Sequence, residues 1–80
     1  MKIRVLVSYK DSVLDPQGQT VRNALLTMGY EFVKDVRQGK VFMIEIDDLP
    51  DDKIKQVIPE LADKVLANPI IEKFSWEIIE

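Results

Sequence analysis

Eighty residues are enough for one domain and too few for two separate cores. The composition, 46% hydrophobic and 31% charged, is typical of a folded protein rather than a disordered one. The formal net charge of -3 argues against electrostatic binding to nucleic acid or to an anionic membrane, because both need clustered Lys and Arg.

The first predicted elements are a half-buried strand over residues 2–10 and a helix that follows it. Apolar and polar side chains alternate along the strand, and Leu6 is the exception to the alternation. Asp15 is a natural N-cap for the helix, and Pro16 suits its first position. The apolar face of the helix follows the spacing i, i+3, i+4, i+7 in Val21, Ala24, Leu25 and Met28. Gly29 is a natural stop.

The middle of the chain, residues 32–47, is predicted to be extended, with a polar interruption at residues 37–40. Beyond the interruption, apolar side chains occupy both faces of the predicted strand. A strand that is apolar on both faces needs a cover that so small a domain does not supply by itself. We therefore expect a homodimer or a tetramer, with self-association through Val41, Phe42, Met43 and Ile44.

A second helix and a last strand complete the chain. The helix opens at residues 49–52 with acidic first-turn residues, which favour the helix dipole. Its apolar stripe contains Pro59, which lacks the N–H needed by the carbonyl one turn earlier, so we expect a kink or break near residues 55–58. Asn68 and Pro69 end the helix. Residues 70–79 form the last strand, with Phe74, Trp76 and Ile78 on the same face as Glu72.

These elements predict a single α+β domain, residues 1–80, in the order β-α-β-α-β, with its sheet completed or covered in a homodimer. The long middle strand either bends or folds into a hairpin at Gln38 and Gly39, and the hairpin version is the ferredoxin-like order β-α-β-β-α-β. No apolar run is long enough to cross a membrane, no signal-peptide pattern is present, and cysteine is absent. We expect a cytoplasmic protein.

The residue types indicate no catalytic or metal-binding chemistry in this chain. Without cysteine and histidine there is no thiol nucleophile, no thiolate zinc site and no side chain that titrates near neutral pH. The aspartates at 47, 48, 51 and 52 lack the spacing of a calcium loop. We expect no catalytic residue and no metal site.

Three short segments carry the remaining signal: residues 13–18, 36–40 and 66–72. Each is explained singly as a helix cap, a turn or a helix stop. Gly18 is unusual, because glycine in a first turn costs roughly 1 kcal/mol against alanine and is favoured where something approaches the backbone closely. The free amides of that turn could bind a carboxylate of a partner. Arg37 and Lys40 frame Gly39, so an acidic or phosphorylated group could approach there, although the segment is not a P-loop.

Taken together and in this order, the three segments resemble the PurS family, the small subunit of phosphoribosylformylglycinamidine (FGAM) synthase, over essentially the whole chain. The resemblance implies a non-catalytic subunit of an ATP- and glutamine-dependent complex of de novo purine (IMP) biosynthesis. It implies a chain that bridges the glutaminase and synthetase subunits and aids ammonia transfer. Pro59 and the apolar C-terminal residues 76–80 depart from the family's pattern.

The resemblance also implies where cofactors and partners belong. ATP and Mg are expected in the synthetase subunit and no cofactor in this chain. The expected partners are a second copy of the chain, the synthetase subunit and the glutaminase subunit, with no nucleic acid and no membrane. The expected partner-binding residues come from the three segments: Asp15, Gln17, Gly18, Arg37, Gly39, Lys40, Asn68 and Glu72.

Three other functions are weighed beside this one. A ferredoxin-like dimer that senses a small molecule between its subunits is the main alternative. An RNA-binding module is disfavoured, because the aromatic motif that stacks bases on such sheets is missing. An independent enzyme is disfavoured by the lack of a catalytic constellation.

Overall fold

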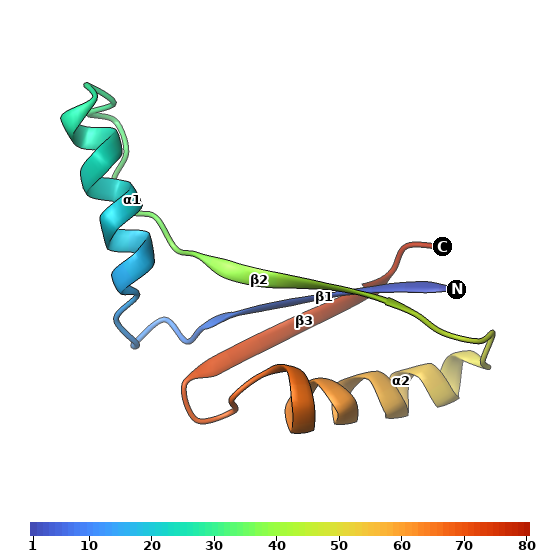
Figure 1. Cartoon of the computed structure of the whole chain (residues 1–80). Helices are drawn as coiled ribbons and strands as arrows, with labels where there is room; N and C mark the ends of the chain where they lie inside the picture. Colours follow the sequence, from blue (N-terminus) through green and yellow to red (C-terminus); the bar gives the residue numbers. More distant parts are fainter.

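The computed structural model describes all residues, 1–80, as a three-stranded antiparallel sheet with one helix packed on it and a second helix projecting from one end (Figure 1). The elements are β1 (Lys2–Tyr9), α1 (Pro16–Thr27), β2 (Gly39–Glu45), α2 (Asp51–Leu61), the π-helical turn η1 (Ala62–Leu66) and β3 (Glu72–Ile78). The sheet order is β2-β1-β3. The α+β class and the order β-α-β-α-β are confirmed.

One face of the sheet forms the core with α2. Val5 of the central strand lies between Phe42 of β2 and Trp76 of β3 in the register of the sheet. Ile3, Val5 and Val7 of β1 are fully buried and alternate with the exposed Arg4 and Leu6, as the period of a strand requires. From α2 and η1, residues one turn apart complete this core: Ile54, Ile58 and Ala62.

The opposite face of the sheet carries no helix. We call it the open face and define it by Arg4 and Leu6 of β1 with their register neighbours Val41, Met43, Ser75 and Glu77. Leu6, Val41 and Met43 are 46%, 56% and 57% exposed. Arg4 forms an ion pair with Glu77 across the strands. The apolar residues that sequence periodicity placed on both faces of β2 are therefore divided between the core and this open face.

Helix α1 leaves the sheet on the side opposite α2 and projects away from it (Figure 1). Residues 33–38 then run back toward the sheet without regular secondary structure. Arg22 fixes this return segment by donating from Nε to the Lys34 carbonyl at 2.9 Å. The predicted extended stretch 32–47 is thus a strand only from Gly39 to Glu45, and the hairpin at Gln38 and Gly39 does not form.

Pro59 does not break α2 where the sequence predicts it. Lys55–Ile58 remain α-helical, and the irregularity comes later, as the π-helical turn η1. The buried residues Ile54 and Ile58 lie one turn apart on the core, so packing against the sheet holds the helix through the proline. The wider π-turn is closed by the Ala67 N–H, which donates to the Ala62 carbonyl at 2.9 Å.

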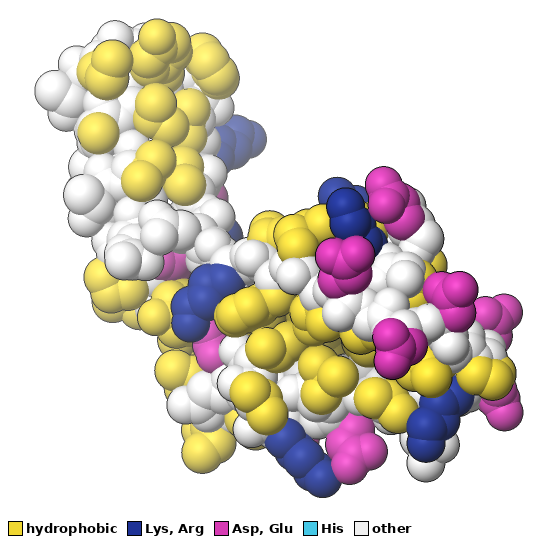
Figure 2. Space-filling view, turned by 45° about the vertical axis from the view of Figure 1, so that its right-hand side comes forward, with side chains coloured by type: hydrophobic (Ala, Val, Ile, Leu, Met, Phe, Trp, Pro, Cys, Tyr) yellow, Lys and Arg dark blue, Asp and Glu magenta, His cyan; other side chains and the backbone are white.

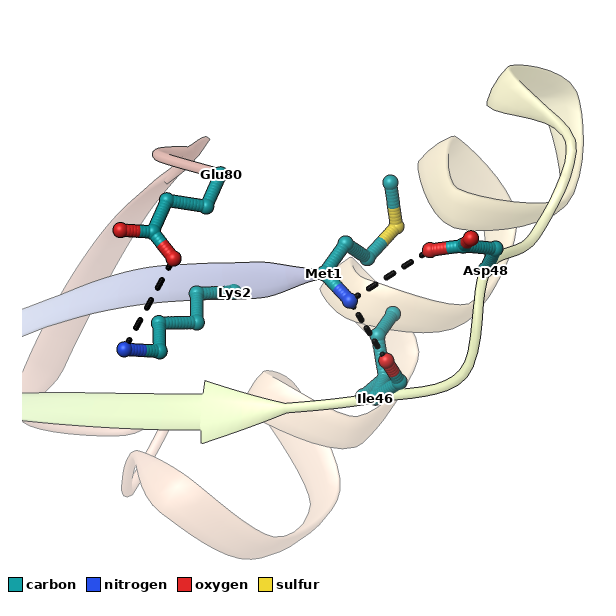
Figure 3. Close-up of polar contacts among 5 residues, drawn as sticks. All are labelled: Met1, Lys2, Ile46, Asp48 and Glu80. Carbon is teal, nitrogen blue, oxygen red and sulfur yellow. Dashed lines mark hydrogen bonds and ion pairs between the residues drawn. The ribbon is translucent and has the colours of Figure 1, made fainter.

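The end of the sheet away from α1 is closed by contacts of the first residues (Figure 3). The ammonium group of Met1 donates to the Ile46 carbonyl at 2.8 Å and lies 3.5 Å from Asp48 Oδ1. Lys2 Nζ lies 3.7 Å from Glu80 Oε2. These pairs are largely exposed and contribute little each. No helix is both long and apolar enough to cross a membrane.

Candidate functional site

The base of α1 is organised by the carboxylate of Asp15. This residue is the N-cap, as predicted, and Pro16 occupies the first turn. Asp15 Oδ1 accepts from the Gly18 N–H at 2.9 Å, and Oδ2 accepts from the Gln38 N–H at 2.6 Å. The side chain is only 1% exposed. One carboxylate therefore holds both the start of α1 and the residue that enters β2.

Position 18 requires glycine, because the return segment packs closely against the backbone there. A Cβ atom built on it would lie 2.3 Å from the Val36 carbonyl oxygen and 2.7 Å from Asp15 Oδ2. Both distances are far below van der Waals contact, and one of the atoms belongs to the backbone. The glycine that seems out of place in a first helical turn is thus explained by the chain's own residues 36–38.

Arg37 and Gln38 tie the return segment to the start of α1. Arg37 Nη2 donates to the carbonyls of Lys10 and Val13, at 3.0 and 2.8 Å. Gln38 Nε2 donates to Gln17 Oε1 at 2.8 Å. Together with the Asp15 contacts, these bonds set the direction in which α1 leaves the sheet.

The third segment reaches the same end of the sheet through Glu72. Its Oε1 accepts from the Asn68 N–H at 2.7 Å, and its Oε2 lies 3.9 Å from Lys40 Nζ. Asn68 Oδ1 in turn accepts from the Ile70 N–H at 3.1 Å, which shapes the turn into β3. The contact between Lys40 and Glu72 joins this turn to β2 across the end of β1.

The three segments thus meet at one place, which we call the junction: Asp15, Gln17, Gly18, Arg37, Gln38, Gly39, Lys40, Asn68 and Glu72. Its surface contains a hollow of about 290 Å³ lined in part by Gln17, Lys40 and Glu72. Every buried side-chain polar atom of the chain already has a hydrogen-bond partner. No group of three or more metal-ligating side chains occurs. The junction offers polar surface for contact.

Comparison with known proteins decides the family. The PurS family model, described as phosphoribosylformylglycinamidine (FGAM) synthase, matches residues 2–80. The chain belongs to the PurS family. The chain is 43% identical over 79 residues to the FGAM synthase subunit PurS of Bacillus subtilis, a match that covers 99% of this chain and 93% of the relative. It is 45% identical over 74 residues to the PurS subunit of Mycobacterium leprae, covering 92% and 87% of the two chains.

Solved PurS structures share the fold as well. The B. subtilis PurS structure superposes with a TM-score of 0.86 at 43% identity and covers 99% of this chain and 98% of that one. A chain of the PurLQS structure from Thermotoga maritima gives a TM-score of 0.86 at 26% identity, covering 98% and 95%. The relatives are named as a subunit of the synthase, which agrees with the sequence-based view that a PurS chain by itself is not catalytic.

The eight predicted partner-binding residues all lie at the junction, but not all reach its surface. Asp15 and Gly18 are buried within the chain, and Glu72 is partly buried. The exposed members are Gln17, Arg37, Gly39, Lys40 and Asn68. Their contact with a partner stays a prediction.

The side chains of the four predicted self-association residues lie on two different faces of the sheet. Val41 and Met43 lie on the open face, whereas Phe42 and Ile44 pack against the chain's own core. Alternation along β2 places neighbours on opposite faces, so a continuous run could not lie on one surface. Leu6, which sequence reasoning recorded only as an exception to alternation, joins Val41 on the open face.

Acid is expected to destabilise the junction through Asp15. The two N–H donors, Gln38 first and Gly18 second, lower the pKa of the Asp15 carboxyl group. A group whose pKa is lower in the folded state stabilises above its unfolded value, about 3.9, and that stabilisation is lost as pH falls through the folded value. We expect the free energy of unfolding in urea to fall below about pH 4 in the wild type, and less steeply in Asp15→Asn.

A matched control for this measurement is Asp11→Asn. The pKa of Asp11 is also lowered, by its hydrogen bond from Lys73, but its side chain is exposed. Exposed pairs contribute little to stability, so Asp11→Asn should keep the wild-type dependence on pH. An Asp15→Asn variant with the wild-type dependence would contradict the role assigned to this carboxylate.

Proposed function

We propose that this chain is a non-catalytic subunit of FGAM synthase in purine biosynthesis, and that as a homo-oligomer it bridges the glutaminase and synthetase subunits. The observation that carries the proposal is the match over nearly the whole chain to PurS proteins, one of them within an assembly named PurLQS. The proposed compartment is the cytoplasm. No observation favours the small-molecule-sensing alternative.

The chemistry of the reaction explains why a bridging subunit would help. In the proposed complex, the glutaminase releases ammonia from glutamine. The synthetase activates the amide oxygen of its substrate with ATP and Mg, and ammonia then attacks the amide carbon. Ammonia released into neutral water becomes mostly ammonium, which has no free electron pair and does not attack. Holding the two active sites together shortens the path through water and keeps ammonia reactive. No side chain of this chain needs to enter the reaction.

The polar side chains exposed at the junction support a docking role. The exposed side chains of Gln17 and Lys40 present an amide and a cationic donor around a shallow hollow, beside the partly buried carboxylate of Glu72. Donors of this kind recognise carboxylates on a partner surface. Asp15 and Gly18 would not contact the partner themselves. They would act indirectly, because they fix the position of α1 and of the loop that carries Arg37.

Reconstitution of the three subunits tests the proposal. FGAM formation is measured with the glutaminase, the synthetase and this chain, and again with this chain left out. We expect the glutamine-dependent rate to be lost without the chain, because ammonia no longer passes between coupled sites. The rate with an added ammonium salt should survive, because the synthetase active site is intact.

The rate measured with the ammonium salt is the control, because it shows whether the synthetase subunit is intact. Full glutamine-dependent activity without this chain would overturn the bridging proposal. Loss of both the glutamine-dependent and the ammonium-dependent rates would also contradict it, because it would place the chain's contribution in the synthetase reaction itself.

A further inference from the structure

Two large apolar side chains next to the junction are exposed on turns whose backbone is held in place. Leu14 is 71% exposed and follows Val13, whose carbonyl accepts from Arg37 Nη2 at 2.8 Å. Ile70 is 79% exposed, and its own N–H donates to Asn68 Oδ1 at 3.1 Å. Neither side chain packs on the chain's own core. A side chain on a fixed backbone needs little further ordering when it binds, which is the property of an interface anchor.

The two turns that carry these side chains lie side by side at one end of the sheet. The Lys10 N–H donates to the Ile71 carbonyl at 2.9 Å, and Lys73 Nζ lies 2.9 Å from Asp11 Oδ1. Figure 2 shows hydrophobic side chains beside a basic one where the projecting helix joins the sheet. We call this part of the molecule the junction end and define it by the two exposed apolar residues and the hollow of the junction.

Lys40 is the cation of the hollow that its own chain leaves available. Its Nζ lies 3.9 Å from Glu72 Oε2, beyond hydrogen-bond distance, and its side chain is 64% exposed. Glu72 keeps a partner without it, because Oε1 accepts from the Asn68 N–H at 2.7 Å. By contrast, Arg37 is already bonded to two carbonyls. An incoming carboxylate can therefore pair with Lys40 and leave Glu72 with a hydrogen bond.

This cation lies on the other face of the sheet from the exposed self-association candidates. In the register of the sheet, Lys40 is opposite Val7, whose side chain is buried in the core. Residues directly opposite in register project to the same face. Val41 and Met43 lie on the open face, so a contact between copies there would leave Lys40 accessible to another protein.

The charge of the junction end favours an acidic partner over a second copy. Residues 8–18, 36–40 and 66–73 carry four basic and three acidic side chains, a net charge of +1. The whole chain carries -3, so the remaining residues carry -4. Opposite charges steer association and like charges oppose it, so two copies would not meet through this end. A junction end on the acidic part of the next copy would be a head-to-tail contact, which forms rings or open filaments.

We propose that the junction end docks on a catalytic subunit of FGAM synthase through two apolar anchors and one ion pair. Leu14 and Ile70 enter apolar hollows on that subunit, and an aspartate or glutamate side chain of the subunit enters the hollow beside Lys40. This inference rests on the proposed function and names the residues and the chemistry of one bridging contact. The apolar anchors supply affinity, and the ion pair fixes the orientation of the two proteins.

Titration of the chain into the other two subunits tests this contact. The glutamine-dependent rate of FGAM formation is measured against the concentration of the full chain, with ATP, Mg and glutamine in excess. We expect Leu14→Ala, Ile70→Ala and Lys40→Glu each to raise the half-maximal chain concentration about tenfold or more, the effect of losing one interface anchor. The maximal rate should return at high chain concentration, because these variants weaken docking and leave the active sites intact.

Two matched controls separate the hollow from charge in general. Lys55→Glu makes the same change of charge on the exposed side of α2, and Lys40→Arg keeps the charge in the hollow. Both should have half-maximal concentrations close to that of the wild type. The far-UV spectrum and the mass of each variant alone should also match the wild type, because the altered side chains are exposed and lie off the open face.

The outcomes separate the docking contact from the proposed function. A glutamine-dependent rate that needs no chain would overturn both. A rate that needs the chain but is supported equally by the wild type and all three variants would overturn the docking contact alone. A lower mass of Lys40→Glu or Ile70→Ala alone would overturn it too, because the junction end would then join copies of the chain. Inorganic phosphate that binds the wild type and not Lys40→Glu, with equal half-maximal concentrations, would make the hollow a small-anion site instead.

Discussion

Replacing Gly18 by alanine is expected to destabilise the chain by about 2–3 kcal/mol, the usual range for forcing an extra group into a packed region. In an ordinary helical position the same change stabilises by roughly 1 kcal/mol. The sign reverses here because the added Cβ would lie 2.3 Å from the Val36 carbonyl oxygen. The loop carrying Gln38 would have to move, and the buried Asp15 carboxylate would lose one of its two donors.

Urea unfolding at a fixed protein concentration measures this effect, because the proposed self-association would make the midpoint depend on concentration. Asn23→Ala on the same helix is the control. Asn23 is exposed, so its replacement should stabilise by a few tenths of a kcal/mol, about 0.5 at most. If Gly18→Ala stabilised the chain as Asn23→Ala does, the close approach of the return segment would be wrong.

Truncating Ile54 to alanine is expected to cost about 2–5 kcal/mol, the range for large-to-small changes in a core. Ile54 is fully buried between α2 and the sheet, where its neighbours are Ile58 and the side chains of β1. A domain of this length has a total stability of about 4–12 kcal/mol. The variant should therefore lose a large share of its stability and unfold far below the wild-type denaturation temperature.

Val65→Ala is the matched control for the core truncation. Val65 lies in η1, shortly after α2, and its side chain is exposed. Its truncation should change the free energy of unfolding by no more than about 0.5 kcal/mol. Equal effects of Ile54→Ala and Val65→Ala would contradict the assignment of the α2 face that packs on the sheet.

Local sequence signals predict well those elements whose structure is set by residues close to one another in the sequence. The alternation along β1 and the Asp15 cap are both confirmed, because side-chain period and capping are set within a few residues. The stretch after α1 was predicted wrongly as strand. Its apolar residues, such as Phe32 and Val33, belong to a turn and return segment beside α1, and local pattern does not distinguish that from a strand.

Pro59 shows a second limit of local reasoning. The missing N–H predicts a break one turn earlier, but Ile54 and Ile58 bury their side chains on both sides of that turn. Packing against the sheet keeps Lys55–Ile58 helical. Helix stability here comes from tertiary contact rather than from propensity.

The junction could be predicted only in part for a similar reason. Asp15 and Gly18 stand out by residue type. Gln38 does not, because it acts through its backbone N–H, which every residue except proline possesses. The contact between Gln38 and Asp15 spans 23 positions in the sequence and lies beside Gly39, the first residue of β2 that pairs with β1.

The proposed function requires that this chain associates with itself and joins the two catalytic subunits. The most direct measurement is its mass in solution, alone and after mixing with the glutaminase and synthetase subunits. We predict at least twice the 9.2 kDa of one chain when it is alone, and a single larger species that contains all three proteins after mixing. A 9.2 kDa monomer that elutes apart from both subunits would contradict it.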